Sequence, residues 1–86
     1  MAALTISYFA WVREGMGCDT ETVMLPPELV SIADLIDWLS ARDVAGAAVF
    51  ADRTRIRAAR DGAMVGLDAA IDGAKEIALF PPVTGG

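Results

Sequence analysis

The clearest structural signal in this chain is the segment Ser31-Ile32-Ala33-Asp34-Leu35-Ile36-Asp37-Trp38-Leu39. Its apolar side chains recur with the spacing i, i+3, i+4, i+7, which is typical of a helix with one buried face: Ile32, Leu35, Ile36 and Leu39. Ser31 can cap the first turn, and Asp34 three residues later completes a variant of the capping box. We therefore predict an amphipathic helix that begins after Ser31 and ends near Ala41 or Arg42.

Two segments ahead of this helix alternate with period two, which is typical of strands. The first covers residues 4–12, with Leu4, Ile6 and Tyr8 toward the core, and the second covers residues 20–25. A turn is expected between them at Gly15-Met16-Gly17. Because the two segments are close in sequence, we expect them to pair in antiparallel fashion.

Shorter elements are expected after the helix. Residues 43–50 are compatible with a short helix or an irregular crossover, residues 56–59 with a strand, and Met64 and Val65 with a brief edge strand. The last strand covers residues 76–80, with Phe80 facing outward. The resulting order predicts an α+β fold of the β-grasp type, a mixed four- to five-stranded sheet with one main helix across one face and the first and last strands side by side at its centre. We expect this domain over residues 1–80 and a flexible tail over residues 81–86.

Composition excludes several classes of function. The 86 residues include no histidine and one cysteine, and the net charge is −5. Histidine-based catalysis, histidine metal ligands, an internal disulfide and a cysteine zinc cluster are therefore excluded, and we expect no metal site. The acidic balance argues against nucleic acid and anionic membranes and favours partners with positive surfaces. Neither a secretory signal nor a membrane span is evident, so we expect a cytoplasmic protein with a reduced thiol.

The tail has the composition of a reactive end. Pro81-Pro82 favours an extended exit from the last strand, and Gly85-Gly86 can thread a slot too narrow for any Cβ atom. Two terminal glycines arise by chance in about 1 in 200 chains. An unshielded carboxylate at Gly86 becomes electrophilic only when it is activated, for example as an acyl-adenylate from ATP, and a sulfur donor can then convert it into a thiocarboxylate. The alternative is an inert, frayed end.

The outer face of the predicted sheet is a second candidate feature. Phe9 and Trp11 are expected on the outer face of the first strand and Phe80 on that of the last. If these strands pair, Phe9 and Phe80 share an exposed patch, together with Met64. Clustered aromatic side chains beside Arg13 favour a protein interface, whereas the alternative is that the crossover segment covers them.

Two further features are interpreted as carrying no chemistry. Cys18 is expected in a turn, where Glu14 and Asp19 oppose the lowered pKa that a reactive thiol needs, so we interpret it as a bystander. Four closely spaced arginines indicate a solvated strand edge rather than a phosphate site: Arg53, Arg55, Arg57 and Arg60.

The sequence also resembles a known family at both ends. Its last residues, Ala78-Leu79-Phe80-Pro81-Pro82-Val83-Thr84-Gly85-Gly86, resemble the C-terminus of the small subunits of molybdopterin synthase, which have an aromatic residue, Pro-Pro-Val, a small polar residue and Gly-Gly. Tyr8-Phe9-Ala10-Trp11-Val12-Arg13-Glu14 is similar to the family's aromatic-aromatic-Ala-x-apolar-Arg-Glu stretch. Residues 43–55 match loosely, and Arg60 and Asp61 depart from the family pattern.

This resemblance implies a ubiquitin-like sulfur carrier with no catalytic site and no bound cofactor of its own. An adenylating, ubiquitin-activating-like enzyme would use ATP to activate the carboxylate of Gly86, and a sulfur donor would complete the thiocarboxylate. The tail would enter the large subunit of molybdopterin synthase and donate sulfur to cyclic pyranopterin monophosphate, which forms the dithiolene of molybdopterin. The threading residues are Pro81, Pro82, Val83, Thr84 and Gly85, and the docking residues are Phe9, Arg13, Met64 and Phe80. The family also implies a heterotetramer of two small and two large subunits.

Three alternatives stay open. The chain could carry sulfur for thiamine, cysteine or a tungsten cofactor, although Pro-Pro-Val-Thr before Gly-Gly argues against the thiamine carrier. It could be a ubiquitin-like modifier that is joined to lysines through an amide. It could also be a plain interaction domain with an inert tail.

Overall fold

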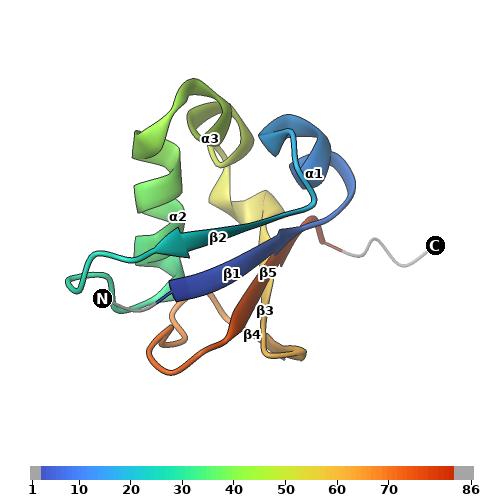
Figure 1. Ribbon diagram of the computed structural model, residues 1–86. Coiled ribbons are helices and arrows are strands. Elements are labelled where there is room, and N and C mark those ends of the chain that lie inside the picture. The colour runs from blue at the N-terminus through green and yellow to red at the C-terminus, as the bar shows by residue number, and fades with distance from the viewer. Residues whose placement is uncertain (1–2, 83–86) are drawn as a thin grey trace.

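The computed structural model describes residues 3–82, which form a five-stranded mixed sheet with helices gathered on one side (Figure 1). The strands are β1 (Ala3–Tyr8), β2 (Thr20–Met24), β3 (Arg57–Arg60), β4 (Ala63–Val65) and β5 (Glu76–Phe80). The helices are α1 (Ala10–Met16), α2 (Ile32–Arg42) and α3 (Val44–Val49), followed by a short 3₁₀ turn, η1 (Arg53–Arg55). This is the predicted β-grasp architecture, with two additional short helices.

The strand order is β2-β1-β5-β3-β4. As predicted, the first and last strands lie side by side at the centre, and they run parallel with Ile6 opposite Ile77. β2 is antiparallel to β1, and β3 is antiparallel to both β5 and the edge strand β4. Because β1 and β5 are parallel, both strands end at the same end of the sheet, where Phe9 follows β1 and Pro81 follows β5.

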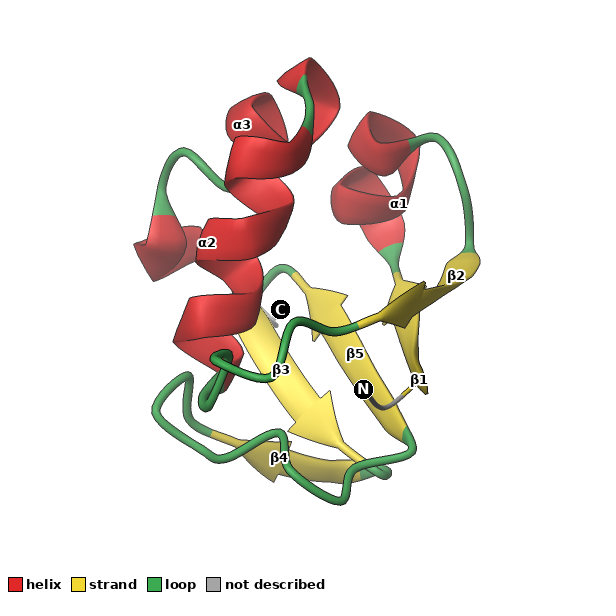
Figure 2. Cartoon of the chain, turned by 60° about the vertical axis from the view of Figure 1, so that its left-hand side comes forward, coloured by secondary structure: helices red, strands yellow, loops and turns green. Residues whose placement is uncertain are grey.

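The core lies between the sheet and α2. One apolar cluster joins the inward side chains of the central strands to the buried stripe of α2, and its members include Leu4, Ile6, Tyr8, Ile32, Leu35, Ile36, Leu39, Ile77 and Leu79. The predicted capping box is present, since the N–H of Asp34 donates to Ser31 Oγ and the N–H of Ser31 donates to the Asp34 carboxylate, each at 3.1 Å. Figure 2 shows α2 standing on the same side of the sheet as α1 and α3.

The predicted first strand is wrong beyond Tyr8. Residues 10–16 form α1 instead, and Gly17, with φ of 82°, closes this helix in the left-handed region, with its N–H donating to the carbonyl of Arg13. Gly15-Met16-Gly17 is therefore the end of a helix rather than a free turn. The sequence of this segment is also compatible with a strand. The helix, however, buries the side chain of Val12 completely, and such burial in the tertiary structure outweighs the local strand preference.

Residues 43–50 form a helix rather than an irregular crossover. The carboxylate of Asp43 accepts the N–H of Gly46 at 2.8 Å and so caps α3. Val49 and Phe50 are buried in the core at the end of this helix. None of the helices in residues 3–82 is long and apolar enough to cross a membrane.

Candidate functional site

The candidate site lies at the end of β5, where the C-terminal tail begins. Pro81 and Pro82 follow Phe80 without regular structure and are half-buried. The N–H of Phe9 donates to the carbonyl of Leu79 at 3.3 Å, which holds the end of β1 against the end of β5. The remaining tail residues, which include the predicted reactive position, lie outside the described residues: Val83, Thr84, Gly85 and Gly86.

Two aromatic side chains mark the base of this tail. The rings of Phe9 and Phe80 meet edge to face, with centroids 6.5 Å apart and planes at 78°. This geometry is a favourable one for aromatic pairs. Phe9 is 50% exposed, whereas Phe80 is half-buried. The structure therefore brings these two predicted docking residues together beside the exit of the tail.

The outer face of the sheet continues from Phe80 toward Met64. Cross-strand pairing places Ser7, Ala78, Ala59 and Met64 in one row across β1, β5, β3 and β4. The first three side chains are small, and Met64 at the edge is 65% exposed. Ser7 is buried, and Ala78 and Ala59 are half-buried. The exposed apolar end of the row at Met64 is therefore the part available for contact with another protein.

Arg13 lies on α1, one turn after Phe9. Its backbone N–H donates to the carbonyl of Phe9 at 3.2 Å, which keeps the two residues close together. Arg13 is exposed, and it forms no ion pair within residues 3–82. Of the four predicted docking residues, Phe9, Arg13 and Phe80 thus gather at the tail, and Met64 lies further along the same face of the sheet.

The interpretation of the arginine cluster as a solvated strand edge is wrong, because β3 lies inside the sheet between β5 and β4. Arg53 pairs with Asp37 at 2.6 Å, away from the sheet edge. Arg60 donates to the carbonyls of Ala70 and Asp72, at 2.8 Å each. Two members of the cluster are thereby committed to structural contacts within the chain.

The sequence predicts no particular contacts for the other two arginines, and the structure shows contacts for both. Arg57 is the cross-strand partner of Phe80, and its guanidinium donates to the carbonyls of Thr54 and Ile56, at 3.1 Å each. The guanidinium of Arg55 lies over the ring of Trp11, 5.1 Å from its centroid. Pairing the predicted strands at residues 56–59 and 76–80 in antiparallel register is the signal that could have placed Arg57 beside Phe80.

A half-buried polar network lies at the opposite edge of the sheet. The hydroxyl of Tyr8 donates to Glu21 at 2.6 Å, and Arg42 donates two bonds to the same carboxylate, at 2.8 and 2.9 Å. The hydrogen-bonded guanidinium of Arg42 lowers the pKa of Glu21. The pKa of Tyr8 is raised, mainly by burial and also by the hydrogen bond to Glu21. This network joins β1, β2 and α2, and its members are too far apart in sequence to be recognised as a motif.

Cys18 lies in the bend before β2. Burial raises the pKa of its thiol, and the charge of Glu21 raises it further. A raised pKa leaves less of the nucleophilic thiolate at neutral pH. This agrees with the prediction of a bystander thiol.

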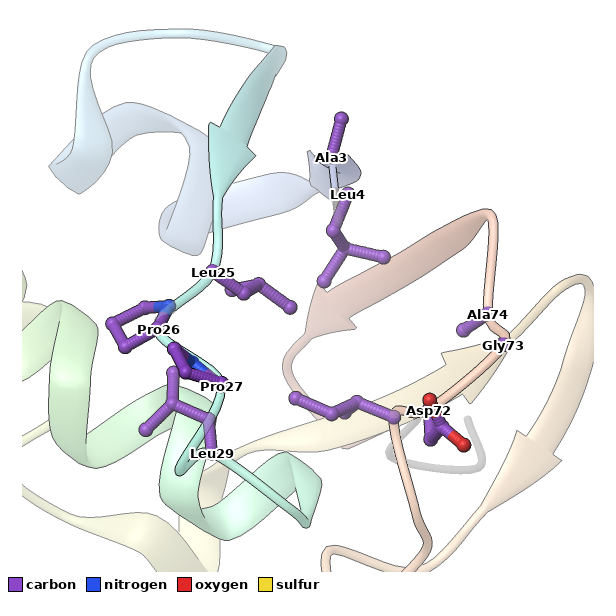
Figure 3. Close-up of a pocket in the computed structure, with 10 residues that line it drawn as sticks. Ala3, Leu4, Leu25, Pro26, Pro27, Leu29, Asp72, Gly73 and Ala74 are labelled. Carbon is purple, nitrogen blue, oxygen red and sulfur yellow. The ribbon is translucent and has the colours of Figure 1, made fainter. Parts of the chain in front are cut away.

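A cavity of about 370 Å³ lies at the other end of the sheet (Figure 3). Its lining includes Leu4 at the start of β1, Leu25 and Pro26 after β2, and Asp72 and Ala74 before β5. Since β5 is five residues long, about 17 Å of strand separate this cavity from the tail. The cavity therefore lies at the opposite end of the sheet from the tail. Within residues 3–82, no three Cys, Asp or Glu side chains gather as metal ligands do.

Comparison with protein families matches residues 6–86 to the model of the ThiS family. This chain belongs to the ThiS family. It is therefore a ubiquitin-like protein of the sulfur-carrier type. A search of curated proteins found no match to this ThiS-family protein.

Solved structures of two archaeal proteins share the fold of this ThiS-family protein. A candidate molybdopterin converting factor, subunit 1, from Pyrococcus furiosus is 26% identical with a TM-score of 0.74, and the match covers 96% of this chain and 100% of that chain. SAMP1 from Haloferax volcanii is 26% identical with a TM-score of 0.69, and the match covers 99% of this chain and 100% of that chain. The predicted fold and family are confirmed.

Proposed function

We propose that this ThiS-family protein is the sulfur-carrier subunit of molybdopterin synthase, with a mature chain that ends at Gly86. The observation that carries the proposal is the motif Phe80-Pro81-Pro82-Val83-Thr84-Gly85-Gly86, which continues from the central strand β5. Phe80 is packed against Phe9 at the base of this motif. The likeness to the Pyrococcus furiosus protein supports the same assignment.

The proposed chemistry takes place on the terminal carboxylate. An oxygen of the Gly86 carboxylate attacks the α-phosphate of ATP in the adenylating enzyme, and pyrophosphate leaves. A persulfide donor then displaces AMP from the acyl-adenylate, and a thiol cleaves the S–S bond to leave the thiocarboxylate. In the large subunit, this sulfur attacks a side-chain carbon of cyclic pyranopterin monophosphate and an oxygen substituent of that carbon leaves. Water then cleaves the acyl–sulfur bond, which returns the carboxylate and leaves sulfur on the pterin.

The chain itself positions this carboxylate and does not catalyse. In this proposal the partners supply the catalytic acids and bases, in keeping with a chain that contains no histidine, and ATP is bound by the adenylating enzyme. The proposed docking surface for both partners, the adenylating enzyme and the synthase large subunit, consists of Phe9, Arg13, Met64 and Phe80. A heterotetramer in the cytoplasm is the assembly that we propose.

A single-turnover assay tests the specificity for molybdopterin. Thiocarboxylated protein is mixed with the large subunit and cyclic pyranopterin monophosphate, and molybdopterin is measured as its fluorescent oxidation product. The proposal predicts that each molybdopterin formed consumes two thiocarboxylates, because a dithiolene contains two sulfur atoms. Sulfur transfer to a thiamine, cysteine or tungsten-cofactor precursor in place of the pterin would contradict it.

A ubiquitin-like modifier is the second candidate, and the likeness to small archaeal modifier protein 1 favours it. The same acyl-adenylate would then be attacked by a lysine Nζ of a target protein, forming an amide and releasing AMP. Mass spectrometry of digested cell extract distinguishes the two functions. Lysines that carry the C-terminal glycines of this chain would support the modifier, whereas a carrier leaves none.

A further inference from the structure

We propose that Arg13, Arg55 and Arg57 form a cationic rim around the exit of the tail, and that this rim docks onto a carboxylate-rich surface of the protein that receives the tail. The inference rests on the proposed function, because it takes the tail to be delivered to a partner protein. It adds two residues, Arg55 and Arg57, to the docking surface, and it specifies the charge of the partner.

The first support is the distribution of ion pairs. Arg42 and Arg53 are neutralised by the carboxylates of Glu21 and Asp37. The three rim arginines are exposed and form no ion pair within residues 3–82. The net charge of the whole chain is −5, yet three cations without an ion pair in the described residues lie in the segments that flank the end of β5. Among the described carboxyl groups with a lowered pKa, only Asp52 is affected by a rim arginine: hydrogen bonds from Thr54 lower its pKa most, and the charge of Arg55 also lowers it. The partner of this rim is therefore expected to be acidic, in contrast to the positive partners that the overall charge suggests.

The second support is the position of the rim on both sides of β5. β5 lies between β1 and β3 in the sheet. Arg13 is on α1, which follows β1, whereas Arg57 is on β3 directly opposite Phe80. Arg55 on η1 reaches across to Trp11 of α1, so this pair joins the two flanks. The end of β5 is thus flanked by the segment that follows β1, which carries Arg13, and by β3, which carries Arg57.

Two of the three guanidinium groups are held in place. Arg55 is held by its cation–π contact with Trp11, and Arg57 is held by the carbonyls of Thr54 and Ile56. Preorganised arginines lose less side-chain entropy when they bind carboxylates. The bonds of Arg57 use Nη1, and within the described part of the chain Nη2 and Nε have no partner.

The arrangement fits a protein surface better than a phosphate group. The apolar pair Phe9 and Phe80 lies at the centre, and an apolar centre with a polar rim is the usual anatomy of a protein interface. A phosphate site needs donors that converge on one point, but Arg55 faces the Trp11 ring, and Arg57 leans toward the carbonyls of Thr54 and Ile56. The cavity in Figure 3 lies at the far end of the sheet.

The same face carries negative charge at its other end. Glu76 begins β5, where its carboxylate accepts a hydrogen bond from Ser7, and Asp61 lies beside it, accepting the N–H groups of Lys75 and Glu76 at 3.0 and 2.9 Å. Along β5, carboxylates therefore lie at the start of the strand, where the charges of Arg60 and Lys75 also act on Asp61. Arg57 lies opposite Phe80 at the end of the strand. An acidic partner surface is attracted to the tail end and repelled from the other end, which orients the tail toward the partner.

Charge reversal tests the cationic rim. Binding of the full chain to its own adenylating enzyme is measured by titration calorimetry at low and high salt for Arg55→Glu, Arg57→Glu and Arg13→Glu. Lys75→Glu is the matched control, because it makes the same change in net charge on an exposed cation outside the rim. Each rim variant is expected to weaken binding by at least about tenfold at low salt, and the control by less than about twofold. The loss should shrink at high salt, which screens surface charges.

Several results overturn the inference. Rim variants that bind like Lys75→Glu, while their circular dichroism melts match that of the wild type, show that the rim does not contact the partner. Saturable shifts of the Arg55 and Arg57 amide resonances with inorganic phosphate or ATP alone show that the rim is a phosphate site. Thiocarboxylation of the wild-type chain is measured in parallel at saturating enzyme. Its failure contradicts the proposed function, whereas its success with unaffected rim variants contradicts only the rim.

Discussion

Phe9 and Phe80 meet edge to face across the ends of two parallel central strands, with their ring centroids 6.5 Å apart. They are far apart in sequence, and the parallel pairing of β1 with β5 brings them together. The contact fixes the point from which the tail leaves. A partner that accepts the tail would therefore cover both rings.

Phe9→Ala should weaken binding to the adenylating enzyme and leave the fold intact. Phe9 is 50% exposed, so its truncation should lower the free energy of unfolding by less than about 1.5 kcal/mol, most of it from the aromatic pair. Its loss at the centre of an interface should weaken binding by about tenfold or more. Val44→Ala on α3, where Val44 is 86% exposed, is the control. Equal affinities of both variants would contradict the docking surface.

Ser31→Ala should destabilise the domain by about 1 kcal/mol, because it removes the side-chain acceptor of the α2 capping box. Ser40→Ala, inside the same helix, should change stability by less than about 0.5 kcal/mol. Urea denaturation followed by circular dichroism measures both changes. If the two variants were equally stable, the capping box would not contribute to the fold.

Acid should destabilise the domain partly through Glu21. The bonded Arg42 guanidinium lowers the pKa of Glu21 in the folded state, so this contribution is complete above the unfolded value of about 4.3 and is lost as the pH falls through the lower folded pKa. The pKa of Asp34 is lowered by the N–H groups of Ser31 and Val30, and it acts in the same direction. Urea midpoints measured between neutral pH and about pH 3 should therefore fall.

Glu21→Gln should weaken this acid dependence and lower the free energy of unfolding at neutral pH by about 1–2 kcal/mol, since it removes the charge bonded to Arg42. Glu28→Gln is the control, because Glu28 is exposed and forms no hydrogen bond or ion pair among the contacts of residues 3–82. An acid dependence that is the same in both variants would rule out the Glu21 network as its source.

Gly46→Ala should destabilise the packing of α3 on α2. A Cβ atom at residue 46 would collide with the backbone carbonyl of Leu39, which cannot move aside cheaply. We expect a loss of about 1–3 kcal/mol, the usual cost of overpacking. Gly66→Ala is the matched control, since its Cβ meets only the flexible Asp68 carboxylate. Equal denaturation midpoints for the two variants would contradict this account of the contact.

The main helix and the two central strands were predictable because each has a recognisable sequence pattern of its own. The stripe and cap of α2, the alternation of β1 and β5, and the turn at Asp61-Gly62 each agree with the structure. The helix α1 was not predictable, because Phe9-Ala10-Trp11-Val12 is an apolar run that can equally continue the preceding strand. Its first residue, Ala10, has a φ of 53°, a left-handed conformation that local propensity disfavours.

The candidate site was predictable only in part, for a related reason. Phe9 and Phe80 could be paired once the central strands were placed side by side. The contact of Arg55 with Trp11 could not be predicted, because the sequence predicts a strand at Trp11, which lies on a helix instead. The missed contacts thus follow from one misassigned segment, and they involve residues that are distant in sequence.

The mass of the intact chain tests the central claim, a sulfur-carrying terminus at Gly86, most directly. The chain is incubated with its adenylating enzyme, ATP and a sulfur donor, beside a variant that lacks Gly86. We predict the mass increase of one oxygen-to-sulfur exchange, located by fragmentation at the C-terminal glycine, in the wild type and its absence from the variant. An unchanged wild-type mass, while pyrophosphate release shows that the terminus is being adenylated, would contradict the account.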